Sequence, residues 1–83
     1  MKANVDIVFK AYDENHMFVL VKRGTNNLYM DLGVCQLINE MEYWDLPLKS
    51  AEMQGEYGYI FSKDIDVEHM KMEIERFIVH NNI

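Results

Sequence analysis

The spacing of apolar residues changes along the chain, and this change constrains the fold more than any other feature of the sequence. Between residues 4 and 12, Val5, Ile7 and Phe9 fall at every second position, which is the period of a β-strand. Residues 17–23 begin with apolar side chains at odd and even positions alike, which is typical of a central strand. Later apolar residues recur every three or four positions, as in helices. The chain is therefore predicted to combine strands with helices.

Turn signals divide the first part of the chain into three predicted strands. "DENH" separates residues 4–12 from 17–23, and "GTNN" separates the latter from a short third strand, "LYMD" at 28–31. These three strands should form an antiparallel meander. "EYGYIF" at 56–61 is the predicted fourth strand.

Two helices are predicted, each with an aspartate at its N-cap. Asp31 should cap the first helix, which would run to about Trp44 before Pro47 prevents its continuation. Asp66 should cap the second helix, with Met70 among its buried residues. The predicted core-facing residues are, for the first helix, Val34, Leu37, Ile38, Met41 and Trp44, and for the second, Val67, Met70, Ile74, Phe77 and Ile78.

We therefore predict an α+β fold with the order β-β-β-α-β-α. A three-stranded antiparallel meander and a fourth strand would form the sheet, and two helices would pack on one sheet face. The 83 residues contain no linker, repeat or low-complexity stretch, so residues 1–83 are expected to form one small domain.

The stretch "EYGYIFS" places Tyr57, Tyr59 and Phe61 on one face of the fourth strand. "YGYI" resembles the aromatic strand on which RNA-recognition motifs stack bases. However, no lysine or arginine leads into it, and the predicted element order is not that of this family. We therefore predict that these rings pack within the protein and that Gly58 lets a neighbouring ring or backbone approach closely.

Negative charge is concentrated in the second half of the chain. Residues 1–39 carry four acids and four bases, whereas residues 40–75 carry ten acids against Lys49, Lys63 and Lys71, and the whole chain has a net charge of −6. Phosphate groups are bound mainly by lysine and arginine, so this balance argues against direct binding of nucleic acid or of an anionic membrane. It favours a basic protein partner, with solubility as the alternative explanation for the acids.

We predict from these observations a small acidic protein–protein interaction module, of the inhibitor, immunity-protein or nucleic-acid-mimic type, that binds a basic surface of a partner. Carboxylates would attract the partner, and aromatic side chains would slow its release. The predicted partner-binding residues are Glu40, Glu42, Tyr43, Asp45, Glu52, Glu56, Tyr57 and Tyr59.

The alternative function is a homo-oligomeric structural or regulatory domain. Val8, Tyr12, Phe18 and Leu20 all have even numbers and should lie on the sheet face that the helices leave uncovered. A contiguous apolar patch of this kind usually marks an interface, so the alternative predicts a homodimer through this face.

No catalytic, cofactor-binding or metal-binding residue is assigned, and the protein is not expected to be an enzyme. His69 and Glu73 lie four residues apart, but no zinc-site pattern accompanies them, and Cys35 is expected to be a packed apolar residue. The chain shows no signal peptide and no membrane anchor, and its single cysteine fits a reducing compartment, so the expected location is the cytoplasm.

Overall fold

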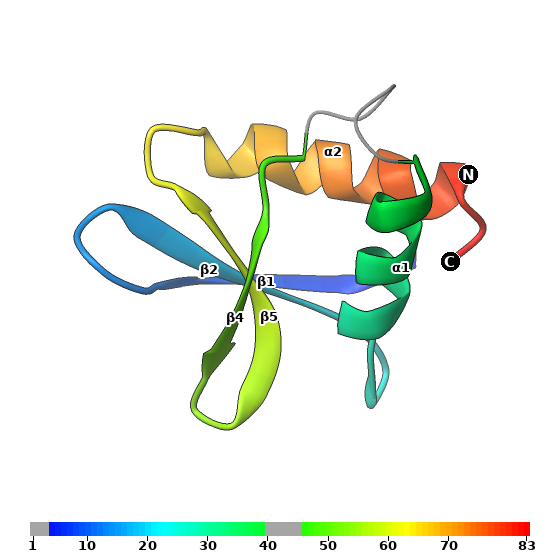
Figure 1. The fold of residues 1–83 in the computed structure, drawn as a ribbon, viewed down its shortest axis with the longest axis horizontal. Coiled ribbons are helices and arrows are strands. Elements are labelled where there is room, and N and C mark those ends of the chain that lie inside the picture. The colour runs from blue at the N-terminus through cyan, green and yellow to red at the C-terminus, as the bar shows by residue number, and fades with distance from the viewer. Residues whose placement is uncertain (1–3, 40–45) are drawn as a thin grey trace.

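The computed structural model describes residues 4–39 and 46–83. Over these residues the chain folds into five strands and two helices in the order β-β-β-α-β-β-α (Figure 1). The elements are β1 (Asp6–Ala11), β2 (His16–Arg23), β3 (Asn26–Asn27), α1 (Tyr29–Asn39), β4 (Lys49–Met53), β5 (Glu56–Ser62) and α2 (Val67–His80).

The four longer strands form an antiparallel sheet in the order β1-β2-β5-β4, and β3 pairs with the end of β2. Phe9 on β1 lies opposite Val19 on β2, which in turn lies opposite Tyr59 on β5. The predicted pairing of the first two strands is confirmed. β2 is a central strand, as its apolar character on both faces predicted.

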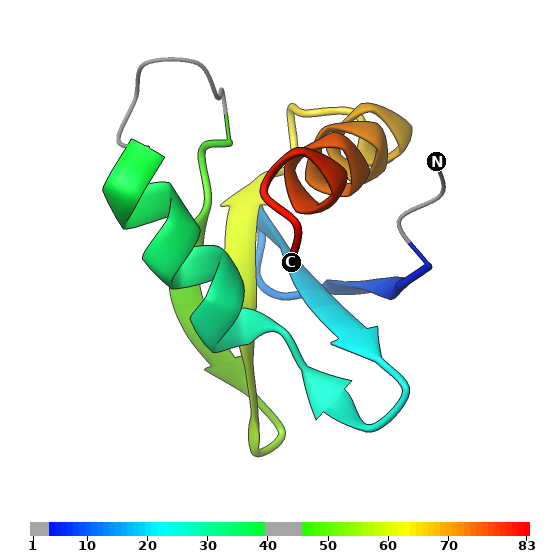
Figure 2. The same cartoon turned by 90° about the vertical axis from the view of Figure 1, so that its right-hand side faces the viewer.

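Both helices pack on one face of the sheet, as predicted (Figure 2). The odd-numbered side chains of β1, β2 and β5 point to this face, where Val19 and Phe61 are fully buried. Leu32 of α1 and Ile74 of α2 complete the same apolar core. The fold is therefore an α+β sandwich with one helical layer.

The second helix agrees with the sequence in detail. Asp66 is the N-cap of α2, and its Oδ2 accepts a hydrogen bond from the backbone N–H of His69 at 3.2 Å. The buried residues of α2 are Met70, Ile74, Phe77 and Ile78, which were all predicted to face the core.

The predicted third strand at 28–31 is wrong, because these residues begin α1. The third strand is instead the two-residue β3, which ends at Asn27. The side chain of Asn27 then accepts a hydrogen bond from the backbone N–H of Tyr29 at 2.9 Å. The helix therefore begins at Tyr29, three residues before Leu32, the first helical residue expected after an N-cap at Asp31.

The sequence pattern also missed a strand. β4 reads "KSAEM", and its mostly polar composition carries little strand signal because β4 lies at the edge of the sheet. Gln54 and Gly55 connect β4 to β5, and both have positive φ values, 53° and 82°. Two consecutive positive φ values are typical of a tight hairpin turn.

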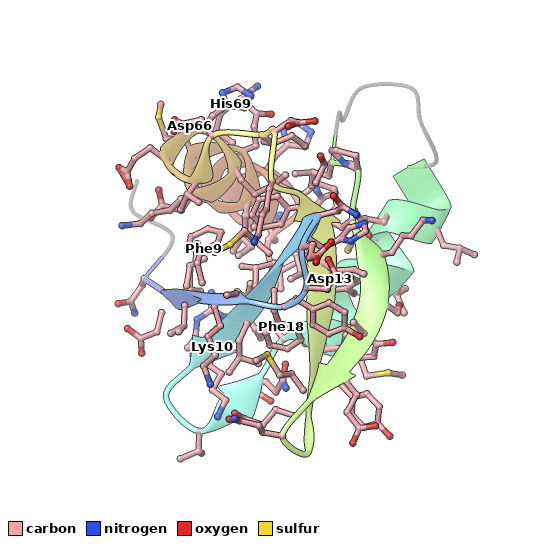
Figure 3. The ribbon with its side chains drawn as sticks, turned by 90° about the vertical axis from the view of Figure 1, so that its left-hand side faces the viewer. Phe9, Lys10, Asp13, Phe18, Asp66 and His69 are labelled. Atoms are coloured by element: carbon pink, nitrogen blue, oxygen red, sulfur yellow. The ribbon has the colours of Figure 1, made fainter. Side chains whose placement is uncertain are left out.

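Gly58 lets a neighbouring ring and backbone approach closely, as predicted, and the ring lies on the face of the sheet opposite the helices. A Cβ atom at Gly58 would lie 2.6 Å from Cζ of Phe18 and 2.5 Å from the carbonyl oxygen of Val19. Figure 3 shows Phe9 on the α2 side of the sheet and Lys10 and Phe18 on the other side. The ring of Tyr12 stacks on Phe18 at a centroid distance of 6.3 Å.

This packing changes the expectation for the uncovered sheet face. Phe18 and Leu20 are buried within the chain, although no helix covers them. Only Val8, at 43% exposure, and Tyr12, at 40%, offer apolar surface from the predicted set. The face is therefore less apolar toward solvent than the sequence indicated.

Candidate functional site: an apolar groove between α1 and β4

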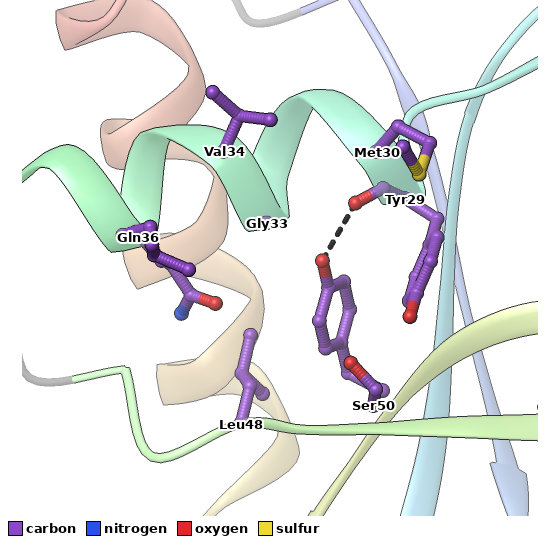
Figure 4. Close-up of a pocket in the computed structure, with 9 residues that line it drawn as sticks. Tyr29, Met30, Gly33, Val34, Gln36, Leu48 and Ser50 are labelled. Atoms are coloured by element: carbon purple, nitrogen blue, oxygen red, sulfur yellow. Dashed lines mark hydrogen bonds between the residues drawn. The ribbon is translucent and has the colours of Figure 1, made fainter.

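An open groove of about 530 Å³ separates α1 from β4 (Figure 4). The described residues that line it carry no charge, and most of them are apolar. α1 contributes one wall, and Leu48, directly before β4, contributes to the other together with Ser50. The lining residues are Tyr29, Met30, Gly33, Val34, Gln36, Leu37, Leu48, Ser50 and Tyr59.

Three large apolar side chains of α1 are exposed along this groove. Met30 is 68% exposed, Val34 53% and Leu37 79%. Their spacing of four and three residues places them on one side of the helix. We call these three residues the α1 stripe. A helix face of this kind in a small domain is the usual signature of a contact surface.

The α1 stripe corrects the predicted orientation of the first helix. Val34 and Leu37 were expected to face the core, but among the described side chains of α1 it is Leu32 that is buried, and Leu28 just before the helix is buried beside it. α1 has apolar residues on two sides, so periodicity alone could not decide which side packs on the sheet. Met41 and Trp44 of the predicted stripe lie outside the described residues, as does the side chain of Ile38.

Tyr59 forms the floor of the groove. Its ring is buried, and its hydroxyl donates a 2.6 Å hydrogen bond to the backbone carbonyl oxygen of Tyr29 (Figure 4). A Cβ atom at Gly33 would lie only 3.1 Å from this hydroxyl, so the absence of a side chain there lets α1 approach β5. Burial, with a smaller electrostatic contribution from Tyr29, raises the pKa of Tyr59 to about 12.

Aromatic packing continues from the groove toward the β4–β5 turn. The ring of Tyr29 lies 5.1 Å from that of Tyr59 and 5.6 Å from that of Tyr57. Tyr57 is more than half exposed, and Glu52 lies opposite it on β4. Glu52 lies two residues after Ser50, so both side chains point to the groove side of β4.

The structure separates the predicted partner-binding residues. Glu52 and Tyr57 lie at one end of the groove, and Tyr59 lies beneath it. Glu56 lies on the opposite face of the sheet, where it forms an ion pair with Lys22. The hydrogen bond from Lys22 lowers the pKa of the Glu56 carboxyl. Glu40, Glu42, Tyr43 and Asp45 lie outside the described residues.

The described acids of the second half do not form one surface. α2 lies at the top of Figure 1 and the β4–β5 turn at the bottom, so the acids of α2 are distant from Glu52. Glu73 of α2 also forms an ion pair with Arg76 at 2.8 Å. Asp31 of α1 and Glu52 of β4 are both exposed, and neither forms an ion pair with a described residue, as is also true of Asp64 and Glu68.

The groove itself was not predicted. Its main residues, Met30, Val34, Leu37 and Leu48, were absent from the predicted site, because two of them were assigned to the core. The available signal was the second apolar series formed by Leu28 and Leu32. That series could have shown that one of the two sides of α1 must face solvent.

Potential metal ligands do not cluster within residues 4–39 and 46–83. No three histidine, cysteine, aspartate or glutamate side chains there form a group that could hold a metal ion. Cys35 is half-buried and packs against the core. Nδ1 of His16 lies within hydrogen-bonding distance of the Asp13 carboxylate, at 2.9 Å.

Neither helix, within the part of the chain that the structure describes, has the length and apolar character that a bilayer span requires. Comparison with known proteins finds no matching family model, no matching curated protein and no matching solved structure.

Proposed function

We propose that this chain is a protein-interaction module that binds a basic segment of a partner protein in the α1–β4 groove. The exposure of the α1 stripe is the observation that carries this proposal. Burying one methionine, valine or leucine side chain contributes about 1.5–3 kcal/mol, so three such residues on one helix supply substantial binding free energy.

Charge supports a basic partner rather than a neutral one. Asp31 lies on the first turn of α1, one residue after Met30, and Glu52 lies on β4, two residues after Ser50; both are outside the groove lining but next to residues that line it. The chain as a whole carries a net charge of −6. An apolar centre with charged groups around it is the common anatomy of a binding surface, and opposite charges on the partner would accelerate association.

The inhibitor, immunity-protein and nucleic-acid-mimic functions are narrower forms of this proposal. They require the carboxylates to lie on one surface, and the described acids do not form one surface. We therefore place the interaction at the groove and propose no enzyme as its target.

A selection from a random peptide library tests the proposal. Peptides of about 12 residues displayed on phage would be selected against the wild-type chain, and their binding would be mapped by amide chemical shifts. We expect the selected peptides to contain more lysine and arginine than acid and to shift amides of α1 and β4. Met30→Ser should weaken their binding about tenfold, which corresponds to about 1.4 kcal/mol of lost apolar burial.

Met72→Ser is the matched control variant, because Met72 is 60% exposed on α2, away from the groove. It should leave affinity unchanged. Asp31→Asn combined with Glu52→Gln should reduce both the affinity and its dependence on salt, since screening shortens the range of charge interactions from about 30 Å at 0.01 M to about 8 Å at 0.15 M salt. A selection that yields no binder, or binders equally insensitive to Met30→Ser and Met72→Ser, would contradict the proposal.

A further inference from the structure

β4 is an edge strand that runs along the groove. It ends the sheet in the order β1-β2-β5-β4 and pairs, among the described residues, only with β5. An edge strand presents alternate backbone N–H and C=O groups along its outer side, and these groups can pair with a further strand. The groove therefore offers backbone hydrogen-bonding groups together with the apolar side chains of α1.

The other edge of the sheet does not offer this combination. A second hollow, of about 570 Å³, lies at β1, but five of its nine lining residues are charged. A strand added there would bury these charges, which is unfavourable unless each finds a partner. The five are Asp6, Lys10, Lys22, Lys71 and Glu75.

We infer that the occupant of the α1–β4 groove is an extended basic peptide segment of the partner, which pairs with β4 as an additional strand. This inference rests on the proposed function. Alternate side chains of the segment would enter the groove and contact Val34 and Leu48, as in other complexes in which a peptide extends a sheet. Lysine or arginine residues at its ends would lie near Asp31 and Glu52.

Two other occupants fit the groove less well. A helix could cover the α1 stripe, but it would leave the outer backbone groups of β4 without new hydrogen bonds. A second copy of this chain would bring two molecules of net charge −6 together and place Asp31 and Glu52 of both near the same contact. A basic extended segment satisfies the backbone groups and the carboxylates together.

The test uses a synthetic nine-residue peptide in which five lysines alternate with four valines. In an added strand, the N–H groups of every second residue point to β4 and the remaining N–H groups point to solvent. Two N-methylated analogues are therefore compared, one methylated on the valines and the other on the three inner lysines. Affinity is measured by titration, and contacts are mapped by amide chemical shifts.

We expect the parent peptide to shift the amides of Lys49–Met53 and of α1. One of the two analogues should bind about tenfold more weakly, because it loses two or more hydrogen bonds to β4, and the other should bind within about threefold of the parent. A control peptide with the same residues in separate lysine and valine blocks should bind more weakly than the parent. Met30→Ser should weaken binding of the parent, and Met72→Ser should not.

The outcomes separate the inference from the proposed function. Equal affinities of the two analogues, or no binding of the parent peptide at about 1 mM, would overturn strand addition. The proposed function would still stand if library-selected peptides shift amides of α1 and respond to Met30→Ser. It would fail, together with the inference, if no peptide shifts amides of α1 or β4.

Discussion

At the scale of single residues, Gly58 is the glycine at which an added Cβ atom would meet the closest neighbours. The position of a Cβ atom there lies 2.5 Å from a backbone oxygen of β2 and 2.6 Å from the ring of Phe18. The ring can shift, whereas the backbone of a central strand cannot do so without disturbing its pairing. The glycine is thus required by packing rather than by its backbone angles.

We expect Gly58→Ala to reduce the free energy of unfolding by about 1–3 kcal/mol, the typical cost of overpacking a core. Urea denaturation measures this change. The double variant Gly58→Ala/Phe18→Leu should recover part of the loss, because a smaller side chain relieves the contact with the ring. A Gly58→Ala variant at least as stable as the wild type would contradict this account, since alanine is otherwise the better residue in a strand.

Tyr59 gives the protein a dependence on pH under alkaline conditions. Its pKa is raised to about 12 in the folded chain from an ordinary value of 10.0. Both states are protonated below pH 10, and between pH 10 and 12 only the unfolded state loses its proton. Stability should therefore decline over this window, by about 2–3 kcal/mol in total.

The variant Tyr59→Phe isolates this effect. It lacks the hydroxyl that bonds to the carbonyl oxygen of Tyr29, so it should be less stable than the wild type at neutral pH by about 1 kcal/mol. Its stability should then decline less between pH 10 and 12, as measured by urea denaturation at each pH. Parallel profiles for the two proteins would show that another group causes the decline.

At the scale of elements, the two helices show what sequence periodicity can and cannot decide. α2 has one apolar side and an aspartate at its N-cap, so both its start and its buried residues were predictable. α1 has apolar residues on two sides. It also starts before the predicted N-cap at Asp31, because the side chain of Asn27 accepts a hydrogen bond from the backbone N–H of Tyr29. Its start and its orientation depend on the sheet that it packs against, which no local pattern specifies.

The same reasoning applies to β4 and the candidate site. An edge strand needs few apolar residues, so "KSAEM" has no clear strand period even though it pairs along its whole length with β5. The groove depends on both the missed strand and the reversed side of α1, and it was therefore beyond prediction from sequence. The burial of Tyr59 and Phe61 in "EYGYIFS" was predictable from their alternation, whereas Tyr57 on the same face is more than half exposed.

At the scale of the whole molecule, net charge bears on the choice between a partner protein and a second copy. Buried Phe18 and Leu20 leave the uncovered sheet face with Val8 and Tyr12 as its exposed members of the predicted set, each less than half exposed. The α1 stripe is more exposed, but Asp31 and Glu52 accompany it. Self-association through either surface must also overcome repulsion between two chains of charge −6.

We therefore expect the isolated chain to sediment as a monomer of 9.9 kDa at micromolar concentration and moderate salt. If it sediments as a dimer, two variants identify the interface. Dissociation by Val8→Lys but not by Val34→Lys would support the alternative homo-oligomeric function through the uncovered sheet face. Dissociation by Val34→Lys alone would show that a second copy of the chain occupies the groove. This result would contradict the proposal that the groove binds a basic peptide, because one acidic chain would then bind another despite their charge.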